Sequence, residues 1–171
     1  SYILGLRAPE PHNISAEVYK NGWMKNGTIV NNNRKYYEYK LPLGEPYGGP
    51  MFFAHYSFLG LNPNNMEDNY VNYWQQNTAH TMINRHYCIY EAPKAFKYSE
   101  NDWGLTACYG GRPPWNYSAR SPQNDDGVIA PTAALGSYPY TPFYSTQVLM
   151  RLAEQSFVHG AYGFADAYSP E

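Results

Sequence analysis

The chain has 171 residues and a formal net charge of −2, which suits one folded domain rather than two. Because the charge is close to neutral, no basic field favours nucleic acid or an anionic membrane surface, and neither partner is expected. No run of about 18 apolar residues is present, so the sequence predicts no membrane-spanning helix.

The N-terminal part is predicted to contain two short helical segments. The apolar stretch of residues 1–6 indicates the end of a helix, closed by Pro9 and Pro11. Residues 13–23 are compatible with a short helix that has Ser15 as its N-cap.

A β-hairpin is predicted at about residues 27–42. Its strands are expected at residues 28–30 and 35–41, around a turn formed by the three asparagines 31–33. The Gly- and Pro-rich residues 42–50 then form a loop.

The second half of the chain is predicted to alternate helices with one long loop. A helix over about residues 66–87 carries Glu67 and Asp68 at its positive N-terminal end. Residues 91–127 form a long irregular tract, a type of segment that is often functional. Two helices follow, over residues 131–137 and 142–159, so the layout suits a helical scaffold that carries its chemistry in loops.

The composition points towards a sugar ligand. Aromatic residues make up 18% of the chain, with 19 Tyr and 4 Trp, whereas charged residues make up 15%. A neutral sugar offers C–H faces for stacking on aromatic rings and hydroxyls for hydrogen bonds to polar side chains. Most of these tyrosines are nonetheless expected to fill the core and its boundary.

Five carboxylates lie among aromatic or turn-forming residues. They are Glu17, Glu100, Asp125, Asp126 and Asp166. Glycoside hydrolysis needs two carboxyl groups that flank the bond, so this pattern is compatible with such an enzyme. Glu17 can equally serve a helix N-terminus, and at least one residue of the Asp125–Asp126 pair is expected to be structural in a turn.

The histidines and cysteines do not predict a metal or organic cofactor. His55, His80 and His86 have no spacing typical of helical metal ligands. His55 is a candidate for substrate contact, whereas the other two are expected to be structural. Cys88 and Cys108 can form a disulfide, but two buried free thiols are the favoured state.

Six ordered segments resemble the bacterial glycoamylase-like family, which includes endo-β-1,2-glucanases. They are residues 16–23, 55–63, 73–77, 100–107, 124–134 and 163–168. The resemblance implies an all-α fold, an (α/α)6 toroid with a small hairpin, of which residues 1–171 form one incomplete catalytic domain. It also implies that the chain corresponds to a later middle portion of that domain, with the general acid before Ser1 and the final helices after Glu171.

The resemblance assigns roles to the candidate residues. Asp166 is the predicted catalytic carboxylate, and Glu100 is the second catalytic candidate within the chain. Residues expected to contact the sugar are Glu17, His55, Trp103, Arg120, Asp125, Asp126 and Tyr168. Two positions depart from the family pattern, because Arg120 stands where a His is common and Ala165 where an aromatic residue is common.

The function implied is metal-free hydrolysis of a glucan, with β-1,2-glucan as the favoured polysaccharide and a bacterial periplasmic or extracellular location. Three alternatives remain open at this point. The first is a different reaction, either α-glucosidic hydrolysis or phosphorolysis with an anion site at Arg112 and Arg120. The second is a non-catalytic carbohydrate-binding role, and the third is a purely structural fragment.

Overall fold

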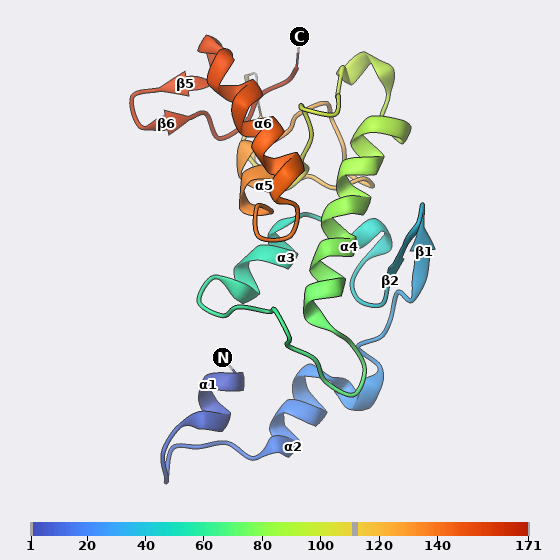
Figure 1. Ribbon diagram of the computed structural model, residues 1–171, viewed down its shortest axis with the longest axis vertical. Coiled ribbons are helices and arrows are strands. Elements are labelled where there is room, and N and C mark those ends of the chain that lie inside the picture. The colour runs from blue at the N-terminus through green and yellow to red at the C-terminus, as the bar shows by residue number, and fades with distance from the viewer. Residues whose placement is uncertain (1, 111–112, 171) are drawn as a thin grey trace.

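The computed structural model describes residues 2–110 and 113–170. Helix α4 runs through the middle, with α5 and α6 on one side and the β1–β2 hairpin on the other (Figure 1). Helices α1 and α2 lie at the end of the molecule away from the C-terminus. The α-helices and strands are α1 (Tyr2–Arg7), α2 (Ala16–Val18), α3 (Phe52–His55), α4 (Tyr73–His86), α5 (Pro131–Gly136), α6 (Pro142–Glu154), β1 (Arg34–Tyr36), β2 (Tyr39–Leu41), β3 (Ala107–Cys108), β4 (Ser118–Ala119), β5 (His159–Gly160) and β6 (Gly163–Phe164).

Short helical turns of other types connect or extend these elements. Two π-helical turns continue α2 and α4, at Tyr19–Trp23 and Tyr87–Glu91. The 3-10 turns are Lys25–Gly27, Pro46–Gly48, Tyr56–Phe58, Lys94–Phe96 and Ser156–Val158. None of the helices is long and apolar enough to cross a membrane, as far as the described residues go.

Helix α4 begins seven residues later than predicted. Asn72 caps it, because its side-chain oxygen accepts a hydrogen bond from the Gln75 amide at 3.0 Å. Asp68 was expected at the helix N-terminus, but its Oδ1 instead accepts from the amides of Tyr70 and Val71 at 2.8 and 3.0 Å. These bonds fold the preceding loop and leave no helical turn at residue 68.

Helix α4 is buried on most sides, although much of it is polar. Ten of its 14 residues are buried. Asn84 explains how this is possible, since its side chain bonds both the amide and the carbonyl of Leu105, at 3.0 and 3.3 Å. His80 similarly bonds the Gly49 carbonyl at 3.0 Å, which confirms its structural role. Gly48 has to be glycine here, because a Cβ would lie 2.2 Å from the His80 ring.

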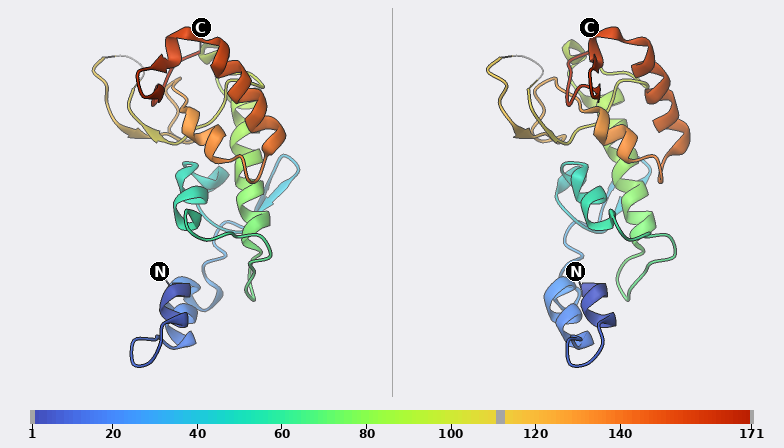
Figure 2. Two further views of the ribbon diagram at one scale, coloured as in Figure 1. Left: turned by 60° about the vertical axis from the view of Figure 1, so that its left-hand side comes forward. Right: turned by 90° about the vertical axis from the view of Figure 1, so that its left-hand side faces the viewer.

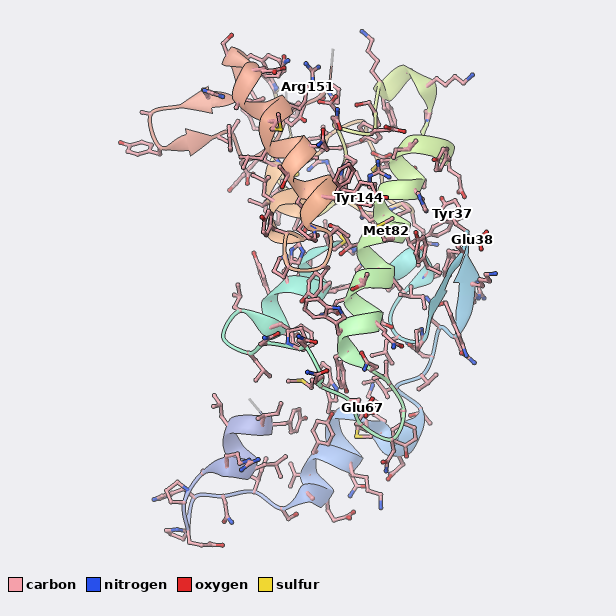
Figure 3. The ribbon with its side chains drawn as sticks, in the orientation of Figure 1. Tyr37, Glu38, Glu67, Met82, Tyr144 and Arg151 are labelled. Atoms are coloured by element: carbon pink, nitrogen blue, oxygen red, sulfur yellow. The ribbon has the colours of Figure 1, made fainter. Side chains whose placement is uncertain are left out.

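The β-hairpin lies within the predicted range, but its predicted turn is wrong. Strands β1 and β2 pair antiparallel, and the chain reverses at Tyr37 and Glu38, which Figure 3 shows at the end of the hairpin. The asparagines expected at the turn serve as anchors: Asn31 Oδ1 accepts from the Gly44 amide at 3.0 Å, and the Asn32 amide group donates to the Glu45 carbonyl.

The remaining helix predictions differ mainly in their ends. Helices α1 and α5 confirm the predictions for residues 1–6 and 131–137, with Ser1 outside the described residues. Helix α6 stops at Glu154 rather than residue 159, and the β5–β6 hairpin that follows was not predicted. The helix expected over residues 13–23 begins at Ala16, and the Ser15 side chain makes no capping bond.

The largest apolar cluster lies in the C-terminal part, where α5, α6 and the loops after α4 meet. Its buried members are Tyr87, Cys88, Trp103, Leu105, Ile129, Ala134, Val148, Leu152, Val158 and Tyr168. Cys88 and Cys108 are buried free thiols, as favoured from the sequence. The tract 91–127 packs against this cluster, and its described residues after Glu91 are irregular apart from a 3-10 turn and strands β3 and β4, which confirms its loop character. The loops that carry the predicted site residues therefore rest on the largest apolar cluster of the described residues.

Candidate functional site

The β3–β4 ribbon brings Arg120 beside Cys108. Ala107 pairs with Ala119 and Cys108 with Ser118, and Arg120 follows directly after β4. The Arg120 side chain is only 2% exposed, and its Nε and Nη2 donate to the two oxygens of Asp126 at 2.6 and 2.9 Å. Burial alone lowers the pKa of Arg120, but pairing with Asp126 outweighs it and the net shift is upward. The guanidinium is therefore charged and paired bidentately.

Asp166 lies close to the end of strand β3, on a different segment of the chain from Arg120. Two backbone contacts fix its segment, since the Ala165 amide donates to the Val158 carbonyl at 2.6 Å and Tyr168 pairs with Ile129. Between these anchors the exposed Asp166 carboxylate accepts a hydrogen bond from the Tyr109 amide at 2.9 Å. Tyr109 follows β3 directly, and Arg120 bonds the Cys108 carbonyl beside it. The structure therefore brings Asp166, Arg120 and Asp126 together at the end of β3.

Two exposed aromatic rings lie beside this group, and the sequence reasoning missed them. Tyr109 and Tyr117 are 57% and 63% exposed, and their ring centroids lie 5.3 Å apart in an edge-to-face arrangement. A cleft of about 600 Å³ adjoins them, with Arg120, Asp126 and Asn116 in its wall. Tyr109 follows β3 and Tyr117 precedes β4, so a prediction that these strands pair would have brought the two rings together. Strands of only two residues show no alternation of polar and apolar side chains that can be recognised in the sequence.

Asp125 has a structural role, as expected for one member of the Asp125–Asp126 pair. Its carboxylate accepts from the hydroxyls of Tyr98 and Tyr87 at 2.7 and 3.2 Å, and from the Gly127 amide at 3.1 Å. Burial, together with this carboxylate, raises the pKa of both tyrosines, so they remain hydrogen-bond donors. Asp125 thus closes a turn and accepts from two tyrosine hydroxyls, and its predicted contact with the sugar stays a prediction.

Trp103 and Tyr168, also predicted to contact the sugar, are both buried in this structure. Trp103 is 1% exposed and Tyr168 is 6% exposed, and both belong to the C-terminal apolar cluster. The Tyr168 hydroxyl donates to buried Asp102 at 3.1 Å, so its polar end also has a protein partner. In this structure neither ring has an exposed face on which a sugar can stack. Both side chains instead pack in the apolar cluster on which the loops lie.

Three further candidates remain, and the contacts described for them do not include Asp166. Glu17 is exposed on α2 beside Lys20, at the far end of the molecule from the C-terminus (Figure 2). His55 on α3 contacts the Ser137 hydroxyl at 3.0 Å, and burial lowers the pKa of His55 to about 4. Glu100 is exposed in the turn that Ser99 and Asp102 close. Their roles in catalysis or sugar binding stay predictions.

The two arginines considered for a phosphate site do not form one among the described residues. Arg120, one of the two arginines considered for phosphate, is occupied by Asp126 and backbone acceptors, and Arg112 lies outside the described residues. Outside residues 1, 111–112 and 171, no group of three or more His, Cys, Asp or Glu side chains is arranged to hold a metal ion.

Comparison with known proteins places this geometry in context. The model of the family described as "Putative glucoamylase" matches residues 1–171. An exo β-1,2-glucooligosaccharide sophorohydrolase (non-reducing end) from Parabacteroides distasonis is 38% identical over 99% of this chain and 26% of that protein.

Solved structures are similar over nearly the same span. A putative glucoamylase from Bacteroides uniformis is 48% identical with a TM-score of 0.87, over 98% of this chain and 40% of that one. An endo-β-1,2-glucanase from Chitinophaga pinensis, solved with sophorotriose and glucose, is 44% identical with a TM-score of 0.87, over 98% of this chain and 41% of that one. The chain thus spans about a quarter of the curated relative and about two fifths of these solved chains.

Proposed function

Because the chain belongs to the family described as putative glucoamylase, we propose that the protein containing it is a glycoside hydrolase that cleaves β-1,2-glucan. Two similar proteins are named for β-1,2-linked glucose substrates, one acting at chain ends and one within chains. The proposal extends the linkage named for them to this chain.

The observation that carries the proposal is the placement of Asp166. Its exposed carboxylate is held by the Tyr109 amide at 2.9 Å, beside the exposed rings of Tyr109 and Tyr117. A carboxylate in this position can accept a proton from an attacking water, while aromatic rings stack on the C–H faces of glucose units. We assign the opposing general acid to a part of the protein outside residues 1–171, since both inverting and retaining hydrolases use two carboxyl groups.

The fold supports the same proposal. Helices α4, α5 and α6 would form one part of an (α/α)6 toroid, with the tract 91–127 contributing to one wall of its cleft. A polymeric glucan cannot diffuse across a membrane, so we place the enzyme in the periplasm or outside the cell.

The test uses the full-length protein with linear β-1,2-glucan and follows oligosaccharide release by chromatography. Asp166→Asn removes the basic carboxylate with little change of shape, and kcat should fall about 10²- to 10⁴-fold while glucan binding is retained. Glu154→Gln, at the exposed end of α6, is the matched control and should keep wild-type turnover. Near-normal turnover by Asp166→Asn would rule this carboxylate out of the chemistry.

Further arms separate the alternatives. Release of sugar from an α-glucan would indicate α-glucosidic hydrolysis, and products that appear only with inorganic phosphate would indicate phosphorolysis. Glucan binding in affinity electrophoresis without any product would indicate a carbohydrate-binding protein. Glu100→Gln tests the second predicted catalytic residue, and unchanged kcat would remove it from the reaction.

A further inference from the structure

Each nitrogen of the Arg120 guanidinium donates a hydrogen bond to another group of the protein. A buried guanidinium is costly unless its donors are satisfied. Here Nε and Nη2 bind Asp126, while Nη1 donates to the Cys108 carbonyl at 2.7 Å and approaches Cys108 Sγ at 3.3 Å. A longer contact of 3.5 Å joins Nη1 to the Tyr109 carbonyl. The side chain, 2% exposed, is therefore directed into the protein and away from solvent.

The key contact lies on one peptide group. The carbonyl of Cys108 and the amide of Tyr109 belong to the same planar unit, whose C=O and N–H point in opposite directions. Arg120 donates to that carbonyl at 2.7 Å, and the N–H of the same unit donates to Asp166 Oδ2 at 2.9 Å. A charged donor on the carbonyl polarises the unit and strengthens its N–H as a donor.

The guanidinium plane is itself fixed. Two parallel hydrogen bonds to Asp126 leave it little freedom to rotate, so the direction of Nη1 towards Cys108 is set as well. Asp126, Arg120, the Cys108–Tyr109 peptide and Asp166 therefore form a continuous line of hydrogen bonds. A displacement of Arg120 passes to the Asp166 carboxylate through one rigid peptide.

We propose that Arg120 is a positioning residue for Asp166, acting through the Cys108–Tyr109 peptide, rather than a residue that touches the sugar. The inference rests on the proposed hydrolase function. It explains why a charged side chain next to the cleft is turned away from solvent, and it replaces the sequence-based expectation that Arg120 binds substrate.

Arg120→Lys in the full-length enzyme tests the proposal, since an ammonium cannot hold Asp126 bidentately and bond Cys108 at once. We expect kcat on β-1,2-glucan to fall about 10- to 100-fold with KM nearly unchanged. Arg34→Lys is the matched control, because Arg34 is exposed on β1 and takes no part in this line of hydrogen bonds, and it should keep wild-type kcat. A raised KM with intact kcat would show that Arg120 binds substrate, and unchanged kinetics would overturn the proposal.

A double-variant experiment excludes a merely structural role. Once Asp166→Asn has removed the carboxylate, adding Arg120→Lys should change kcat little further, whereas independent effects multiply. Amide hydrogen exchange of residues 107–110 should also rise in Arg120→Lys and in Asp166→Asn. Unchanged exchange in both variants, or fully multiplicative losses of kcat, would overturn the inference.

The outcomes also separate this inference from the proposed function. Wild-type protein that releases no sugar from any glucan would refute both. Active wild-type protein with an indifferent Arg120 would refute the inference alone. If Arg120→Lys does not fold, Asp126→Asn provides the second variant, because it loosens the guanidinium while Arg120 stays in place, and a smaller fall in kcat is expected.

Discussion

The two ends of the chain are held in place by different interactions. In the C-terminal part, α6 and the loops around it share a large apolar cluster with Trp103 and Leu152 at 1% and 0% exposure. In residues 2–30, all of which the structure describes, Met24 is the single buried apolar side chain. Figure 2 shows this N-terminal segment set apart from the rest of the molecule.

The N-terminal segment is attached mainly through one polar network. Trp23 Nε1 donates to the Tyr73 hydroxyl at 2.9 Å, and the hydroxyls of Tyr73 and Tyr19 donate to Asp68 Oδ2 at 2.6 and 2.9 Å. Asp166 and Arg120 thus lie in the C-terminal part, which the apolar cluster stabilises. Glu17 lies in the N-terminal segment, which is attached by hydroxyl groups and the Asp68 carboxylate. The loops that carry Asp166 therefore combine both kinds of support, since they pack on the apolar cluster while hydrogen bonds hold the Asp166 carboxylate itself.

The largest expected effect tests the apolar side of this comparison. Leu152→Ala removes a fully buried side chain from the cluster and should lower the free energy of unfolding by about 2–5 kcal/mol. Leu149→Ala, on the same helix but 43% exposed, should cost no more than about 0.5 kcal/mol. Urea denaturation of both full-length variants measures the difference. Equal losses would show that the outer face of α6 is also covered in solution.

The comparison also shows which parts of the fold could be predicted. Helices α5 and α6 each begin with a proline at the first turn and carry apolar residues at helical spacing, so local sequence was sufficient to place their starts, although not the end of α6. The hairpin turn was not readable, because Asn31 and Asn32 are typical turn residues whose use as anchors depends on contacts with residues 44 and 45. The start of α4 depended in the same way on Asp68 bonding its own loop.

The site was predicted in part for a similar reason. The sequence pattern selected Asp166 and Asp126 only among five carboxylates near aromatic or turn residues, and the resemblance to the glycoamylase-like family supplied their roles, which stay predictions. The sequence could not reveal that Trp103 and Tyr168 face inwards, since residues 103 and 168 meet only through tertiary packing. Nor could it show Arg120 and Asp166 on opposite sides of one peptide, because that depends on a ribbon of two-residue strands.

The next effect tests the polar attachment. Tyr73→Phe removes the hydroxyl that joins Trp23 to Asp68, and because Trp23 is partly exposed, the loss of these hydrogen bonds should cost about 0.5–1.5 kcal/mol. We expect faster amide hydrogen exchange across residues 2–30 and little change in α6. Tyr70→Phe is the matched control, because Tyr70 reaches the same carboxylate through its backbone amide, which the substitution leaves intact. Equal exchange in the two variants would contradict a network centred on Tyr73.

The smallest expected effect is a pH dependence confined to the N-terminal side. Burial raises the pKa of Asp68, but hydrogen bonds from Tyr73, the Tyr70 amide and other donors outweigh it, so the net pKa lies below the ordinary 3.8. A carboxylate with a lowered pKa stabilises the folded attachment fully above the ordinary value. That contribution is lost as the pH falls through the lowered pKa, so acid should release residues 2–30 before it disturbs the apolar cluster.

Pepsin provides the measurement, because it is active in this range. Between pH 5 and 2.5, cleavage within residues 2–30 should rise relative to cleavage within residues 142–168. An Asp68→Asn variant corrects for the protease's own pH dependence: its side chain still accepts hydrogen bonds but does not titrate, so its cleavage ratio should stay flat. If wild type and Asp68→Asn gave the same ratio at every pH, the attachment would not depend on this carboxylate. A rise in the wild type alone would establish that the attachment of the N-terminal segment depends on the charge of Asp68.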